Sequence, residues 1–122
     1  FRERTSLDGR ISQASPSYVS KSSGIMIFHV TPKSEWEAQV SHVTFKAASL
    51  EIEGFIHCCT AGQLTGVLQR YFSGQSNLIL LSLDEDKLEA DLKYEPGPDG
   101  ELFPHIYGPI NKSSVDSVEQ LR

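Results

Sequence analysis

Two short apolar runs that each carry a histidine constrain the fold of this chain more than any other feature. The first, Gly54–Thr60, reads Gly-Phe-Ile-His-Cys-Cys-Thr, and the second, Phe103–Gly108, reads Phe-Pro-His-Ile-Tyr-Gly. Apolar runs of this length, bounded by glycine, proline or small polar residues, are typical of buried strands. Two such strands in a chain of 122 residues predict polar side chains that converge on one small-molecule cleft.

Strand alternation divides the first run between two faces. Phe55 and His57 lie on one face, and Ile56 and Cys58 lie on the other. His57 is therefore either a site histidine that hydrogen-bonds a ligand, or a core histidine satisfied by backbone groups. A helix start is expected after Thr60, because Thr60 and Gln63 have the spacing of a capping box. Backbone N–H groups at that helix start can face an anion.

The same argument places His105 and Tyr107 on one face of the later strand, as cleft-lining groups or as part of a half-buried edge strand. His29 lies alone on the first apolar strand, where packing and ligand binding are both open. Glu95 ends a strand just before a Pro/Gly loop, so its carboxylate either stabilises a developing cation or is a solvated strand-end charge. Glu101 is the nearby competitor for that role.

The remaining patterns predict an α+β fold whose second half is rich in strands. Thr31-Pro32 is typical of a helix start, with Thr31 as N-cap, and predicts a helix over about 32–40. Apolar residues at helical spacing from Leu64 to Tyr71 predict a second helix. Pro104 places its strand at an edge or a bulge. Strands are expected at about 25–30, 43–47, 55–58, 77–83, 92–95, 103–110 and 115–118, with a turn over 49–54.

Composition divides the chain into a flexible Ser-rich tail over 1–24 and a single globular domain over 25–122. Seven of the first 24 residues are serines, and few are large and apolar, so this segment cannot bury much surface. The net charge of −5 disfavours nonspecific binding to nucleic acid or anionic lipid. No apolar run approaches the roughly 20 residues that span a bilayer. We therefore expect a soluble protein without a membrane partner.

Metal and thiol chemistry find little support in the sequence. Cys58 and Cys59 are adjacent, so their side chains point to opposite faces of a strand and a mutual disulfide is disfavoured. The absence of a disulfide framework fits a reducing compartment, and we expect the cytoplasm. The histidines lack paired metal-ligand spacing, so no metal site is predicted. A cysteine nucleophile paired with His57 is disfavoured, because small apolar packing explains both thiols.

The order of these motifs resembles one known family, the domain of unknown function numbered 952. The resemblance covers residues 25–118 and rests above all on Gly-Phe-Ile-His at 54–57 and Phe-Pro-His-Ile-Tyr-Gly at 103–108. That family is similar in fold to the ADP-ribosyltransferases. The resemblance therefore implies a twisted, split, antiparallel-rich sheet with two main helices and an NAD-like or ADP-ribose-containing ligand in a crevice. No cofactor is certain, and NAD is expected as a substrate.

The resemblance also implies roles for individual residues. His29 matches the first-strand residue that holds the nucleotide, and Glu95 matches the late-strand glutamate that assists transfer. The Ser-Thr-Ser element of the transferases is missing, and only Thr60 supplies a hydroxyl on the corresponding strand. We expect Glu95 and His57 to be catalytic. The expected ligand-binding residues are His29, Thr60, Gln63, His105 and Tyr107. The alternatives are a non-catalytic module that binds a nucleotide or metabolite, and a protein-interaction domain.

Overall fold

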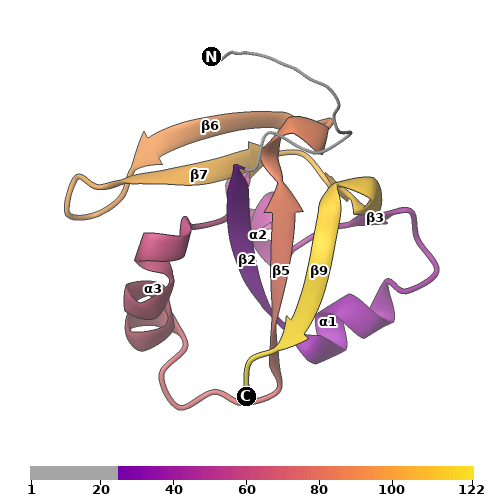
Figure 1. Cartoon of the computed structure of the whole chain (residues 1–122), viewed down its shortest axis with the longest axis horizontal. Helices are drawn as coiled ribbons and strands as arrows, with labels where there is room; N and C mark the ends of the chain where they lie inside the picture. Colours follow the sequence, from indigo (N-terminus) through magenta and orange to yellow (C-terminus); the bar gives the residue numbers. More distant parts are fainter. Residues whose placement is uncertain (1–24) are drawn as a thin grey trace.

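The computed structural model describes residues 25–122, so the predicted Ser-rich tail lies outside the described residues. Antiparallel strands and short helices make up the described chain, which confirms the predicted α+β class (Figure 1). The strands are β2 (Met26–Pro32), β3 (Thr44–Phe45), β4 (Ile56–His57), β5 (Leu78–Asp84), β6 (Asp91–Pro96), β7 (Leu102–Tyr107), β8 (Ile110–Asn111) and β9 (Val115–Gln120). The helices are α1 (Lys33–Ala38), α2 (Ala48–Glu53) and α3 (Leu64–Tyr71), with short 3₁₀ turns at Ala61–Gln63, Glu85–Lys87 and Lys112–Ser114.

The strands form separate sheets that meet at one point. One sheet has the order β2-β5-β9, a second has the order β4-β7-β6, and β3 pairs with β8. In Figure 1, β6 and β7 cross the upper end of the β2-β5-β9 sheet, and α3 stands beside β2. The first two sheets are joined where Phe28 and Cys59 exchange backbone hydrogen bonds of 2.8 Å in each direction. The space beside this bridge is where the candidate site lies.

Two apolar clusters hold the elements together. Every residue of β5 is buried, so this strand is central to both clusters. The larger cluster includes Ile56 and Ile106, which are register partners on β4 and β7. The smaller one packs Leu64 and Leu68 of α3 against the β2-β5-β9 sheet, as the helical spacing of that segment predicts. The apolar faces of these strands and of α3 therefore set the orientation of the two sheets around the Phe28–Cys59 bridge.

The helix predictions need two corrections. Pro32 ends β2 rather than opening a helix, and α1 covers only Lys33–Ala38, because Pro32 pairs with Leu78 in the sheet. The turn predicted over 49–54 is the helix α2, which ends at Gly54 in the left-handed conformation with φ 91°. This helix has no side-chain N-cap and no buried residue, so it lacks the sequence signals of a helix. The described chain thus has three α-helices instead of the two expected.

The position of Pro104 is a third correction. It lies on β7, which is the central strand of its sheet and not an edge strand. The carbonyl of Pro104 accepts a hydrogen bond from the N–H of Cys58, so its backbone polar groups face the β4 side. Pro104 lies opposite Cys58, one residue past the last register pair of β4 and β7, and it contributes an acceptor but no donor to the pairing there.

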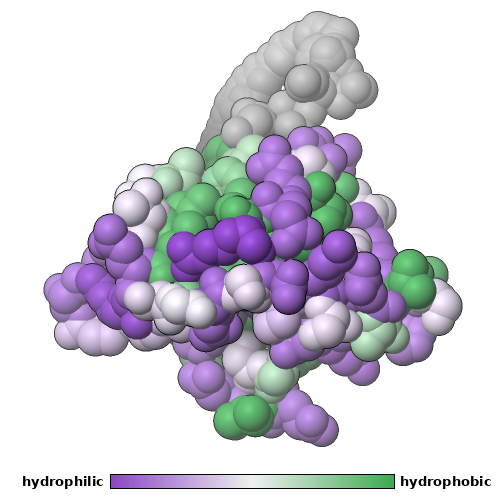
Figure 2. All heavy atoms as spheres, turned by 90° about the horizontal axis from the view of Figure 1, so that it is seen from below, coloured by the Kyte–Doolittle hydropathy of each residue, from purple (hydrophilic) through white to green (hydrophobic). Residues whose placement is uncertain are grey.

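Apolar residues at the surface of this chain do not by themselves indicate a membrane-spanning segment. None of the helices in residues 25–122 has the length and apolarity that crossing a membrane requires. Figure 2 shows one face on which apolar residues gather near the middle, with hydrophilic residues around and across them.

A substitution on β7 tests the described packing of this strand in the core. Ile106 is fully buried, so Ile106→Ala should lower the free energy of unfolding by about 2–5 kcal/mol in urea titration. Ile52→Ala is the matched control, because Ile52 is 79% exposed on α2 and should change stability by no more than about 0.5 kcal/mol. Equal effects of the two substitutions would contradict the described packing.

Candidate functional site

A cavity of about 840 Å³ opens between the two three-stranded sheets and α3. Its volume lies within the range of about 300–1,000 Å³ that is usual for small-molecule sites. Apolar surface predominates in its lining, which includes Phe28, Phe72 and Phe103. The polar lining is concentrated in a few side chains, and three of them are histidines: His29, His57 and His105.

The three imidazoles come from three strands, as the strand predictions require. His29 lies on β2, His57 on β4 and His105 on β7. His57 and His105 are register partners, and their ring centroids are 5.4 Å apart. His29 joins them from the other sheet, because its Nδ1 lies 2.7 Å from the backbone oxygen of His57. The expected convergence of distant histidines on one hollow is therefore present.

Burial makes His29 a neutral hydrogen-bond acceptor. A backbone oxygen only accepts, so His29 Nδ1 carries the proton and donates it to His57. Desolvation lowers the pKa of His29 to about 4, against a partly compensating contribution from the same backbone hydrogen bond. Nε2 is buried and has no hydrogen-bond partner within residues 25–122. An unpaired acceptor on a residue that lines a cavity is suited to a ligand hydroxyl or N–H.

Glu95 reaches the cavity through His105. The Nδ1 of His105 lies 2.7 Å from Glu95 Oε1, and the Tyr107 hydroxyl donates to the same oxygen at 2.6 Å. These hydrogen bonds, from Tyr107 and then from His105, lower the pKa of Glu95, and the carboxylate in turn raises the pKa of Tyr107. Glu101, the other candidate carboxylate, is exposed. His105, Tyr107 and Glu95 therefore form one network in which the imidazole is the member that lines the cavity.

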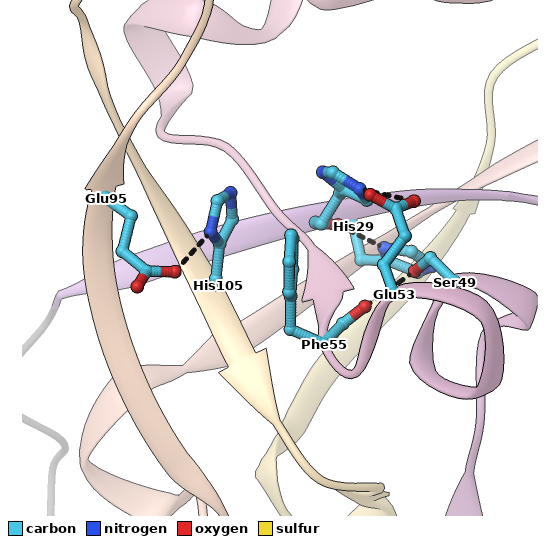
Figure 3. A network of polar contacts seen from close by, with 7 residues as sticks. His29, Ser49, Glu53, Phe55, Glu95 and His105 are labelled. Atoms are coloured by element: carbon cyan, nitrogen blue, oxygen red, sulfur yellow. Dashed lines mark hydrogen bonds and ion pairs between the residues drawn. The ribbon is translucent and has the colours of Figure 1, made fainter.

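A second carboxylate faces the cavity from α2, which sequence analysis did not identify. Glu53 Oε2 lies 3.1 Å from His57 Nε2, and Figure 3 shows Glu53 and Glu95 on opposite sides of Phe55. The Phe55 ring stacks on His105 at 4.2 Å and meets the edge of His57 at 4.8 Å. Ser49 donates to the backbone oxygen of Phe55 at 2.9 Å. Strand alternation already placed Phe55 beside His57, whereas Glu53 joins them only because residues 48–53 are helical.

Thr60 and Gln63, like Tyr107, have structural contacts and are not among the described residues that line the cavity. Gln63 Oε1 accepts from the Thr60 backbone N–H at 3.0 Å, and Gln63 Nε2 donates to the Leu102 backbone oxygen at 2.7 Å. Neither Thr60 nor Gln63 is among the cavity-lining residues of the described chain. These contacts fasten the turn before α3 to β7. Direct ligand contact by either residue stays a prediction.

Thiol chemistry is disfavoured by the surroundings of the two cysteines. Both are free and buried, and both line the cavity. Desolvation raises the pKa of Cys59 to about 11 and raises that of Cys58 further, so neither side chain is a ready thiolate. Within residues 25–122, no group of three histidine, cysteine, aspartate or glutamate side chains has the geometry to hold a metal ion.

Fold and cavity together define a small α+β protein with a cavity of ligand size between two antiparallel sheets. The chain belongs to the family described as "Protein of unknown function (DUF952)", whose model matches residues 30–118. The family expected from the sequence motifs is thereby confirmed. No curated protein matches the chain.

Solved structures of one relative are similar to this chain. The crystal structure of protein CC0527 from Caulobacter crescentus is 33% identical, with a TM-score of 0.73, over 80% of this chain and 86% of that one. The solution NMR structure of the same protein is 33% identical, with a TM-score of 0.68, over 79% and 84% of the two chains. A crystal structure of its double mutant is 32% identical and has a TM-score of 0.73, with coverage of 80% and 86%.

The low pKa of His29 predicts a specific pH dependence of stability. Its folded-state pKa of about 4 lies below the ordinary histidine pKa of 6.5, so the unfolded chain binds the extra proton first as the pH falls. The resulting loss in the free energy of unfolding is absent above about pH 6.5, grows as the pH falls, and reaches about 3 kcal/mol near pH 4. Urea titrations of the wild type and His29→Gln should therefore converge or cross as the pH falls from 7 to 4. A constant difference between the two proteins would contradict a buried neutral imidazole.

Proposed function

We propose that this chain is an ADP-ribosyltransferase-like enzyme that breaks the N-glycosidic bond of NAD or a related nucleotide. One observation carries the proposal: three imidazoles line a single cavity, and two of them are hydrogen-bonded to carboxylates. Cleavage of such a bond passes through an oxocarbenium-like state with positive charge on the sugar. Preorganised carboxylates and hydrogen-bonding groups near that charge lower the barrier.

The arrangement of the sheets supports this proposal. The cavity lies where two separate antiparallel sheets meet, which is similar to the crevice of split sheets in which ADP-ribosyltransferases hold NAD. Its volume of about 840 Å³ can accommodate a ligand of nucleotide size. Aromatic lining such as Phe55 and Phe103 offers flat apolar surface to a heterocyclic base.

Each polar side chain has a role that follows from its hydrogen bonds. His29 Nε2 accepts a hydrogen bond from a ribose hydroxyl, because it is a neutral and otherwise unpaired acceptor. His105 contacts the acceptor that attacks the sugar, orients it and exchanges a proton with it. Glu95 acts through His105, since it fixes the ring orientation and compensates positive charge on the imidazole. Tyr107 in turn holds the Glu95 carboxylate in place.

Nicotinamide release tests the proposal directly. Wild-type protein incubated with NAD should release nicotinamide, quantified by chromatography. His105→Gln should slow release by about 10²–10⁴-fold, the usual contribution of general acid–base catalysis. His42→Gln removes an exposed imidazole that does not line the cavity, and it should retain the wild-type rate.

A thermal-shift titration with NAD distinguishes the alternatives. A ligand that binds only the folded state raises the melting temperature by mass action. A shift without nicotinamide release would favour the non-catalytic nucleotide-binding module. Neither a shift nor release would contradict both nucleotide-based interpretations.

A further inference from the structure

The cavity holds two carboxylate–imidazole pairs, and the proposed cleavage above uses only one of them. The Glu95–His105 pair is the more buried, with 11% of the His105 side chain exposed. The Glu53–His57 pair lies nearer to solvent, with 53% of the His57 side chain exposed. Both histidines and Glu53 line the same cavity.

The two pairs present opposite ring nitrogens to the ligand. His57 bonds Glu53 through Nε2, which leaves Nδ1 without a hydrogen-bond partner among residues 25–122. His105 bonds Glu95 through Nδ1, which leaves its Nε2 without a partner in the same part of the chain. Each imidazole thus has one nitrogen held by a carboxylate and one nitrogen available for proton transfer.

Phe55 fixes the relative position of the two rings. It stacks on His105 with an interplanar angle of 22° and meets His57 edge-on with an angle of 61°. With their centroids 5.4 Å apart, the two imidazoles can act on one small ligand at the same time. Two titratable groups that share a reacting ligand but differ in exposure are the arrangement expected of a base and an acid.

We propose that the Glu53–His57 and Glu95–His105 pairs act together as a general base and a general acid on an N-glycoside whose leaving base must take up a proton. This inference rests on the proposed cleavage of an N-glycosidic bond and narrows its substrate class. Purine nucleosides and nucleotides belong to this class, because a purine is uncharged while attached and leaves poorly as an anion. The pyridinium ring of NAD leaves as neutral nicotinamide and needs no proton.

The proton and bond changes balance with water as the only co-reactant. Nδ1 of neutral His57, at the solvent-exposed side, takes a proton from water as the water oxygen bonds to the anomeric carbon of the sugar. The bond from that carbon to the purine nitrogen breaks, and its electron pair stays on the purine. His105 Nε2–H, at the buried side, gives that purine a proton. The products are the free sugar and the neutral purine, and His57 returns its proton to solvent while His105 regains one.

The charge on these imidazoles depends on the groups that face them from every packed element. For His57 these are Glu53 from α2, His29 from β2 and His105 from β7. For His105 they are Glu95 from β6 and His57 from β4, with Lys93 of β6 as its register partner. Tyr107 acts on this set through its hydrogen bond to Glu95.

The test compares purine release from inosine and inosine 5′-monophosphate with nicotinamide release from NAD, between pH 4.5 and 9. We expect the wild type to release hypoxanthine with a bell-shaped dependence of kcat/KM on pH. His57→Gln should remove the acid limb of that profile, and His105→Gln should remove the basic limb. Each should lower the rate at the optimum by about 10²–10⁴-fold.

The role of Glu53 in positioning His57 is tested separately, by the pH profile of kcat/KM. Glu53→Gln should displace the acid limb to lower pH, because an imidazolium without its carboxylate neighbour gives up its proton more easily. Glu51→Gln is the matched control, since Glu51 lies on the same helix, is exposed and does not line the cavity. It should leave the profile unchanged.

The outcomes separate this inference from the proposed function. Release of nicotinamide from NAD without release of hypoxanthine would overturn the inference and leave the proposed function standing. Release of neither base would overturn both. Hypoxanthine release whose pH profile is the same in Glu53→Gln and wild type would overturn the role assigned to the Glu53–His57 pair.

Discussion

The segment 55–59 is the constraint on which the rest of the structure depends, because it belongs to both sheets. Its first part pairs with β7, where Cys58 N–H donates to the Pro104 carbonyl. Its end pairs with β2, where Cys59 exchanges two backbone hydrogen bonds with Phe28. Backbone groups that are buried must be paired, so these bonds fix how the two sheets meet. The cavity exists because the sheets meet at this segment and diverge beside it.

Successive side chains of segment 55–59 alternate between the face that packs in the core and the face that lines the cavity. Ile56 and Cys58 belong to the main apolar cluster, so their burial holds the segment in register, and Cys58 also borders the cavity. Phe55 and His57 point the other way and line the cavity. A slip of one residue would exchange the two sets, placing an imidazole in the core. The site is therefore coupled to the stability of the fold through a few residues.

Environment gives the three imidazoles different properties. Burial keeps His29 neutral, and its Nε2 is an acceptor without a hydrogen-bond partner in the described part of the chain. His105 is oriented by a carboxylate that itself receives a tyrosine hydroxyl, whereas His57 pairs with a more exposed carboxylate. One residue type thus provides a fixed acceptor and two groups that can exchange protons. Differences of this kind are what the proposed chemistry requires.

The sequence by itself determined the α+β class, most strands, the α3 stripe and the shared strand faces of Phe55 with His57 and of His105 with Tyr107, because period-two alternation and helical spacing are local signals. The sequence also predicted a cleft shared by His57 and His105, but it left both packing and ligand binding open for His29, which the tertiary structure brings to His57. Only the tertiary structure decided that residues 48–53 are helical, that Pro104 lies on a central strand, and that Gln63 bonds Leu102. These features depend on partners far along the chain, which no local pattern encodes. Glu53 joins the site for the same reason, since its approach to His57 requires both α2 and the pairing of β4 with β7.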